Sequence, residues 1–239
     1  MGRQVGREDH IEEATRLVVE RFPEAVAAML GGSSANGGAT ASSDLDIVVL
    51  VPGPPAPHRE TVLSDGRLVE LFVHTVESAR TSIDREIAAR RSPLLQMCGA
   101  SVLLVDHDGA GTRVRDDARR SIAAGPPALS TRERDDRRYA ITALAEDLLD
   151  ATDDDEVAFI GAAALVAISE LVLLEHRTWL GRGKWLARRL RQAAPATAAD
   201  LVAAHRHLHE GGGAERFVGA VLRALAPSGG RLAEGYVRS

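Results

Sequence analysis

The sequence predicts a small α/β domain with a mixed sheet over residues 1–125, followed by an all-helical domain over residues 126–239. Three observations lead to this division. Short β-branched runs typical of strands alternate with helical patterns in the first half of the chain. The sequence Gly125-Pro126-Pro127 then interrupts both patterns, and every periodic segment after it has helical spacing. A chain of 239 residues is long enough for two small domains.

The first domain is expected to begin with a helix and a strand. Residues 8–21 carry apolar side chains at helical spacing between charged ones, and Pro23 ends that pattern. Residues 25–30 form a short apolar run that leads into a glycine-rich loop. Residues 47–51 form a β-branched run, which predicts a strand buried on both faces. The proline-rich stretch 52–57 must then be a loop.

A hairpin is predicted next, because residues 60–63 and 68–74 flank the turn signal Asp65-Gly66. In the second run, Glu70 lies on the face opposite Val69 and the other buried-type residues. An acidic side chain inside an apolar strand is costly to bury unless it meets a cation or a hydrogen-bond donor. Glu70 is therefore a candidate for a functional site.

The rest of the first domain follows an α-β-α pattern. Residues 76–96 have helical spacing that Pro93 divides or kinks, residues 101–106 indicate a strand, and residues 112–123 indicate a helix. The sequence Asp106-His107-Asp108-Gly109 resembles a metal loop superficially, but it is more typical of a strand-to-helix turn.

The second domain is predicted to consist of consecutive helices. Ser130 and Glu133 form a capping box at the start of a helix that ends near residue 151. The acidic residues 153–156 suit the first turn of the next helix, where the helix dipole favours anions. Residues 157–179 are apolar on nearly every side and should form the centre of this domain.

A basic segment and two further helices complete the chain. Residues 177–191 are rich in arginine, turn on two glycines and open a new helix. Helices are expected at residues 198–209 and 214–225, separated by three glycines. His205 and His209 lie one helical turn apart and could bracket a metal ion, although the absence of an HExxH pattern favours a plain surface face.

Composition narrows the class of protein. The 34 acidic and 29 basic residues give a net charge of −5, which argues against a non-specific nucleic-acid binder. The single cysteine, Cys98, excludes an intramolecular disulfide and is expected to be a small buried hydrophobe. The first 20 residues lack an apolar signal region, and the most apolar window, residues 160–174, is shorter than the roughly 20 residues that a bilayer requires. A soluble, cytoplasmic protein is expected.

Residues 31–46 combine a glycine-rich loop with two carboxylates. Glycines such as Gly32 and Gly37 allow close backbone approach, and exposed N–H groups in such loops bind anions. Asp44 and Asp46 follow the loop, and strand alternation places both on one face. Neighbouring carboxylates repel each other unless a cation lies between them, and Mg²⁺ takes such oxygen ligands together with substrate phosphates. The stretch therefore indicates nucleoside triphosphate chemistry.

The pair Gly32-Ser33, followed by Ser43-Asp44-Leu45-Asp46-Ile47, resembles the signature of the DNA polymerase β-like nucleotidyltransferase superfamily. The match is closest to its minimal and antibiotic-modifying members, of the aminoglycoside or lincosamide type. The resemblance implies that residues 1–125 form a nucleotidyltransferase-fold catalytic domain. It also implies that residues 126–239 form a helical domain that closes the active-site cleft.

The resemblance also implies roles for individual residues. Three carboxylates would hold Mg²⁺, namely Asp44, Asp46 and Glu70. The loop residues that would bind the NTP are Gly32, Ser33, Ser34, Gly37 and Ser43. Lys184, the one lysine of the chain, would neutralise the pyrophosphate. A glutamate of the helical domain, Glu170 or Glu175, would deprotonate the acceptor hydroxyl.

The expected function is Mg²⁺-dependent transfer of a nucleoside monophosphate from an NTP, with ATP as the expected donor, to a hydroxyl of a small-molecule acceptor. A helical domain of this length suits an acceptor pocket. Two alternatives stay open, a protein-modifying (AMPylating), antitoxin-like nucleotidyltransferase and a non-catalytic nucleotide-binding module. No membrane or nucleic-acid partner is expected, while the sequence leaves open whether the chain forms a homo-oligomer.

Overall fold

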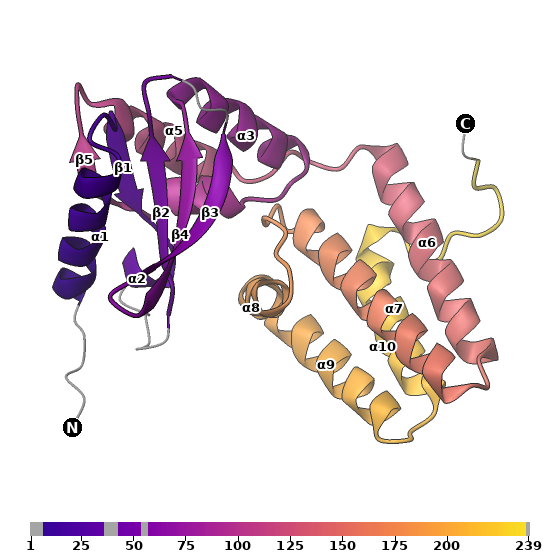
Figure 1. Cartoon of the computed structure of the whole chain (residues 1–239). Coiled ribbons are helices and arrows are strands. Elements are labelled where there is room, and N and C mark those ends of the chain that lie inside the picture. Colours follow the sequence, from indigo (N-terminus) through magenta and orange to yellow (C-terminus); the bar gives the residue numbers. More distant parts are fainter. Residues whose placement is uncertain (1–6, 36–42, 54–56, 238–239) are drawn as a thin grey trace. The chain divides into compact units, whose positions relative to one another are not determined.

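The computed structural model describes residues 7–35, 43–53 and 57–237. The chain divides into two compact units, Met1–Gly125 and Pro126–Ser239 (Figure 1). They are called unit 1 and unit 2 below, and each is described by itself.

Unit 1 contains, among its described residues, a five-stranded mixed sheet in the order β3-β4-β2-β1-β5. The central strand β2 pairs parallel to β4 and antiparallel to β1, and the other neighbours are antiparallel. The C-terminal end of β1 and the N-terminal ends of β2 and β4 therefore lie on the same side of the sheet, at one end of its strands. The strands are β1 (Ala27–Leu30), β2 (Leu45–Leu50), β3 (His58–Ser64), β4 (Arg67–His74) and β5 (Val102–Asp106).

Helices cover both faces of this sheet (Figure 1). The helix α1 (Arg7–Arg21) packs Ala14 and Val18 against alternate residues of β1, β2 and β4, so one face is wholly apolar. The opposite face contacts α3 (Val76–Ala88), α4 (Pro93–Gly99) and α5 (Ala110–Ala124). On that face Val48 and Leu50 of β2 are completely buried, whereas Asp46, at the other end of the strand, stays partly exposed.

The predicted hairpin and the predicted break at Pro93 are both confirmed. Asp65 and Gly66 connect β3 to β4 with positive φ angles of 46° and 81°, as a two-residue type I′ turn requires. Pro93 begins α4 rather than continuing α3, because proline fits the first helical turn but not a helix interior. The mixed sheet with flanking helices predicted from the sequence is thus the fold of unit 1.

Unit 2 is helical. Its elements are α6 (Thr131–Asp150), α7 (Asp154–Glu175), α8 (Lys184–Ala193), α9 (Pro195–His209), α10 (Ala214–Leu225) and a short 3₁₀ turn, η1 (Ala226–Ser228). The predicted capping box starts α6, where the Ser130 hydroxyl accepts from the Glu133 backbone N–H. The five helices from α6 to α10 share one apolar core, and α7 contributes the largest number of its buried residues.

The helix α7 is the one described element long and apolar enough to cross a membrane, with a mean hydropathy of 2.4. Its buried residues, among them Ile168 and Leu171, lie in the core shared with the other helices of unit 2. We interpret α7 as the central helix of this core, because its buried apolar side chains pack against the other helices of unit 2.

Candidate active site

Asp46 and Glu70 lie side by side on the neighbouring strands β2 and β4, near the end of the sheet where β1 ends and these two strands begin. The parallel register pairs Asp46 with Glu70, and the two carboxyl groups share a hydrogen bond. Both side chains are partly buried on the face that carries α3 to α5. The sequence placed them on separate strands, and the structure brings them together.

The pKa of Asp46 is raised to about 6. Burial of the carboxyl is the largest cause, followed by the charge and hydrogen bond of Glu70 and the charge of Asp44, while Arg59 acts in the opposite direction. A carboxylate whose pKa is raised by neighbouring negative charge is stabilised when a cation takes the place of the proton. The donor set therefore fits Mg²⁺, which prefers carboxylate oxygens.

Asp44 lies directly before β2 and is exposed. It is near enough to Asp46 for its charge to raise the pKa of that carboxyl. Within residues 7–35, 43–53 and 57–237, no three His, Cys, Asp or Glu side chains are gathered closely enough to hold a metal ion by themselves. The structure thus presents a carboxylate pair with a third carboxylate nearby.

Arg59 is a site residue that the sequence interpretation missed. Its guanidinium forms an ion pair with Glu70 at 2.5 Å and lies over the Phe72 ring, 4.8 Å from the centroid. The signal was present, because the two-residue turn at Asp65-Gly66 fixes a register in which Arg59 lies opposite Phe72. Arg59 thus orients the Glu70 carboxylate beside Asp46.

Two hydrogen bonds connect the glycine-rich segment to the start of β2. The Gly31 N–H donates to the Asp46 carbonyl at 2.8 Å, and the buried Ser34 hydroxyl donates to the Asp44 carbonyl at 3.3 Å. Gly32 opens the short helix α2 (Gly32–Ala35) with a positive φ of 65°, and a Cβ there would collide with Asp46 Oδ2. The positive φ and this close approach to the carboxylate both favour glycine at this position.

The remaining loop positions are only partly described. Gly37 and the side chain of Ser33 lie outside the described residues. The Ser43 carbonyl accepts a hydrogen bond of 3.0 Å from Arg67 Nη1. Arg67 also forms an ion pair with Glu13 of α1 at 3.4 Å, and both side chains are largely buried. Arg67 thus anchors the residue that precedes Asp44.

Replacement of Arg67 by methionine is expected to destabilise unit 1 by about 2–3 kcal/mol, because it leaves the Glu13 carboxylate buried without its partner. The double variant Arg67→Met/Glu13→Leu should recover more than half of that loss. Amide hydrogen exchange in β2 measures the effect. Equal destabilisation by the single and the double variant would contradict the ion-pair explanation.

The predicted residues of the second half lie in unit 2. Lys184 is exposed at the first position of α8, next to Gly183, which has a positive φ of 49°. Glu175 is held by Arg134 at 2.6 Å. Glu170 lies 3.6 Å from Arg137 at the border of a cavity of about 550 Å³ between α6 and α7.

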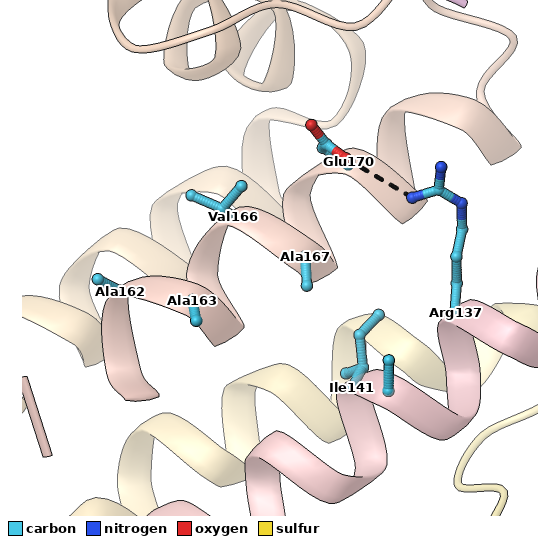
Figure 2. A pocket seen from close by; sticks show the side chains of 8 residues that line it. Arg137, Ile141, Ala162, Ala163, Val166, Ala167 and Glu170 are labelled. Atoms are coloured by element: carbon cyan, nitrogen blue, oxygen red, sulfur yellow. Dashed lines mark ion pairs between the residues drawn. The ribbon is translucent and has the colours of Figure 1, made fainter. Parts of the chain in front are cut away.

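Figure 2 shows this cavity of unit 2, with Glu170 on α7 facing Arg137 on α6. Small apolar side chains form the rest of its wall, so Glu170 and Arg137 supply its charged groups. The lining includes Ile141, Ala162, Ala163, Val166 and Ala167. Of the two candidate glutamates, Glu170 is the one that lines this cavity.

Two other polar groups considered in the sequence have structural roles. Asp106 caps the start of α5, where its carboxylate accepts from the Gly111 N–H at 2.7 Å and from the Thr112 hydroxyl at 2.7 Å. The strand-to-helix turn predicted there is therefore confirmed. Cys98 is buried, and burial raises the pKa of its thiol to about 12, which excludes a reactive thiolate at neutral pH.

Comparison with known proteins agrees with this arrangement. Residues 11–85 match the family model for the nucleotidyltransferase domain, a segment that includes Gly32, both aspartates and Glu70. No curated protein sequence matches the chain. Among solved structures, a nucleotidyltransferase-like protein from Exiguobacterium sibiricum 255-15 is similar with a TM-score of 0.51 and 13% identity, over 91% of this chain and 74% of that one. That likeness shows a shared fold, and the antibiotic-modifying subgroup is not distinguished by either comparison.

Proposed function

Starting from the nucleotidyltransferase domain at residues 11–85, we propose that this nucleotidyltransferase is a cytoplasmic enzyme that transfers a nucleoside monophosphate from an NTP to an acceptor hydroxyl. ATP is the expected donor, and a small molecule is the expected acceptor. The observation that carries the proposal is the pair of adjacent carboxylates, Asp46 and Glu70, beside a glycine that no other residue could replace without a collision.

In this proposal Asp44, Asp46 and Glu70 hold Mg²⁺. When bound, the ion would supply positive charge that stabilises the negative charge developing in the transition state. The raised pKa of Asp46 supports this role, because its causes, burial first and then the neighbouring carboxylates, are ones that a bound cation would offset. Arg59 forms an ion pair with Glu70 and would orient that carboxylate beside Asp46.

The loop that ends at Asp44 is proposed to bind the β- and γ-phosphates. Backbone N–H groups of a glycine-rich segment make an anion site, and Gly32 lets the phosphates approach the carboxylates closely. The Ser34 hydroxyl donates a hydrogen bond to the Asp44 carbonyl, so Ser34 is proposed to shape the loop rather than to donate to phosphate. The roles proposed for Ser33, Gly37 and Ser43 follow from the sequence motif alone.

Unit 2 is proposed to supply Lys184 to the pyrophosphate and Glu170 as the general base for the acceptor hydroxyl. The exposed position of Lys184 at a helix start suits contact with an anion. A cavity of about 550 Å³ beside Glu170 has the size of a small-molecule site. This favours a small-molecule acceptor over a protein acceptor.

Calorimetric titration of the chain with ATP and Mg²⁺ tests the proposal, followed by a pyrophosphate-release assay over a panel of hydroxylated small molecules. We expect binding that requires Mg²⁺ and that is lost in the Asp44→Asn/Asp46→Asn chain, because the two carboxylates are proposed ligands. The matched control is Asp65→Asn, which changes an exposed aspartate of the same unit.

The possible outcomes separate the alternatives. Mg²⁺-dependent binding with pyrophosphate release supports the transferase. Binding without release in the presence of any small molecule or protein acceptor would favour a non-catalytic nucleotide-binding module. A folded wild-type chain that binds no NTP would overturn the proposal.

A further inference from the structure

Two imidazole rings on α9 converge one helical turn apart, far along the sequence from the carboxylate site. The Nε2 atoms of His205 and His209 are 3.3 Å apart. Their ring centroids are 4.5 Å apart, so the nitrogens are closer to each other than the rings are. Both ring nitrogens therefore point towards a shared position.

We propose that His205 and His209 form a binding site for a borderline divalent transition-metal ion such as Zn²⁺. A histidine nitrogen binds Zn²⁺ at about 2.0–2.1 Å, and two nitrogens separated by 3.3 Å at that range subtend about 107° at the ion. This value is close to the tetrahedral angle that zinc adopts in proteins. The spacing of i and i+4 on one helix face gives both ligands without a change of backbone.

The surroundings of His205 hold its ring in place. It packs edge-on against Phe217 of α10, at 5.1 Å between centroids, and Phe217 is fully buried in the core of unit 2. Gly161 of α7 faces the same ring, and a Cβ added there would lie 3.8 Å from His205 Nε2. The first ligand is thus fixed by packing, while the exposed His209 can adjust to the ion.

One electrostatic feature favours a cation at this position. His209 is the last residue of α9, where the helix dipole stabilises positive charge.

The site is open rather than closed. Among the described residues, no third His, Cys, Asp or Glu side chain joins the pair to make a cluster of three. Water or an external ligand would therefore complete the coordination of the ion. Nitrogen ligands favour zinc-class ions over Mg²⁺, so this site and the carboxylate site select different metals.

Titration of the metal-free full chain with Zn²⁺, and with Co²⁺ as a visible-absorption probe, tests the proposal. It is carried out in wild type and in Asp46→Asn, so that zinc bound at the carboxylate site can be subtracted. We expect Asp46→Asn to bind one equivalent, with affinity reduced at least about tenfold when His209→Ala is added. The control is His207→Ala on the same helix, which should bind as wild type does.

His209 is exposed, so His209→Ala should fold normally, and tryptophan fluorescence can verify this because both tryptophans lie in unit 2. Mapping by amide NMR should place the zinc-induced changes on the last turn of α9. Unchanged zinc affinity in His209→Ala, or no Co²⁺ absorption with the wild-type chain, would overturn the proposal, and the two rings would then form only a hydrogen bond.

Discussion

Asp46→Asn is expected to lower NTP turnover by about 10³-fold or more, since the variant removes a charged oxygen ligand proposed to stabilise charge in the transition state. Asparagine has nearly the same shape, so the packing of β2 against α4 should persist. Pyrophosphate release under saturating Mg²⁺ and ATP measures the loss. Asp65→Asn, on the exposed hairpin turn, should retain wild-type turnover.

The same substitution should make unit 1 more stable at neutral pH. The pKa of Asp46 is raised from 3.8 to about 6, so the folded state binds this proton more tightly than the unfolded state does. Ionised Asp46 therefore destabilises the fold above about pH 6, and the penalty disappears as the pH falls towards 4. Because the carboxyl is only partly buried, solvent screening reduces the gain to about 1–2 kcal/mol.

Amide hydrogen exchange of β2 at pH 7.5 and at pH 4.5 measures this gain. Tryptophan fluorescence is unsuitable, because both tryptophans and both tyrosines lie beyond residue 125. A variant that is inactive and also less stable than wild type at pH 7.5 would show that Asp46 supports the fold rather than the chemistry. Loss of activity with a gain of stability is the pattern expected of a functional residue.

The two carboxylates show what could be predicted from the sequence. Strand alternation alone placed Glu70 on the face away from Val69 and Leu71, and the structure confirms this burial pattern. The parallel pairing that sets Glu70 beside Asp46 could not be derived in the same way, because a hairpin is inserted between the two strands. It came from the superfamily resemblance, in which a neighbouring strand supplies a third carboxylate.

The residues that modulate the site were harder to find. Arg59 and Arg67 act through contacts with Glu70 and with the Ser43 carbonyl, and such contacts depend on side-chain direction across neighbouring strands. Arg59 could have been placed from the hairpin register, but Arg67 could not, since its partner Glu13 belongs to a helix packed on the sheet. From the sequence alone, Glu170 and Glu175 were equal candidates for the general base. Only their ion pairs and the cavity beside Glu170 distinguish the two.

Gly32→Ala is expected to lower turnover by about 10²-fold while unit 1 stays folded. An alanine Cβ at this position would collide with Asp46 Oδ2, and the carboxylate would have to move. A displacement of about 1 Å of a group that positions substrate can reduce the rate by about 10²-fold. The backbone φ of 65° adds a penalty of about 1–2 kcal/mol, because alanine rarely adopts the left-handed region.

Gly66→Ala provides the matched control that separates these two effects. Gly66 has a positive φ of 81°, yet nothing lies within 4 Å of the added Cβ. Both variants should lose similar stability in amide hydrogen exchange, but only Gly32→Ala should lose turnover and Mg²⁺-dependent ATP binding. If Gly66→Ala reduced turnover as much, the effect of Gly32 would be one of backbone strain. If Gly32→Ala kept wild-type turnover, contact between this glycine and Asp46 would have no part in catalysis.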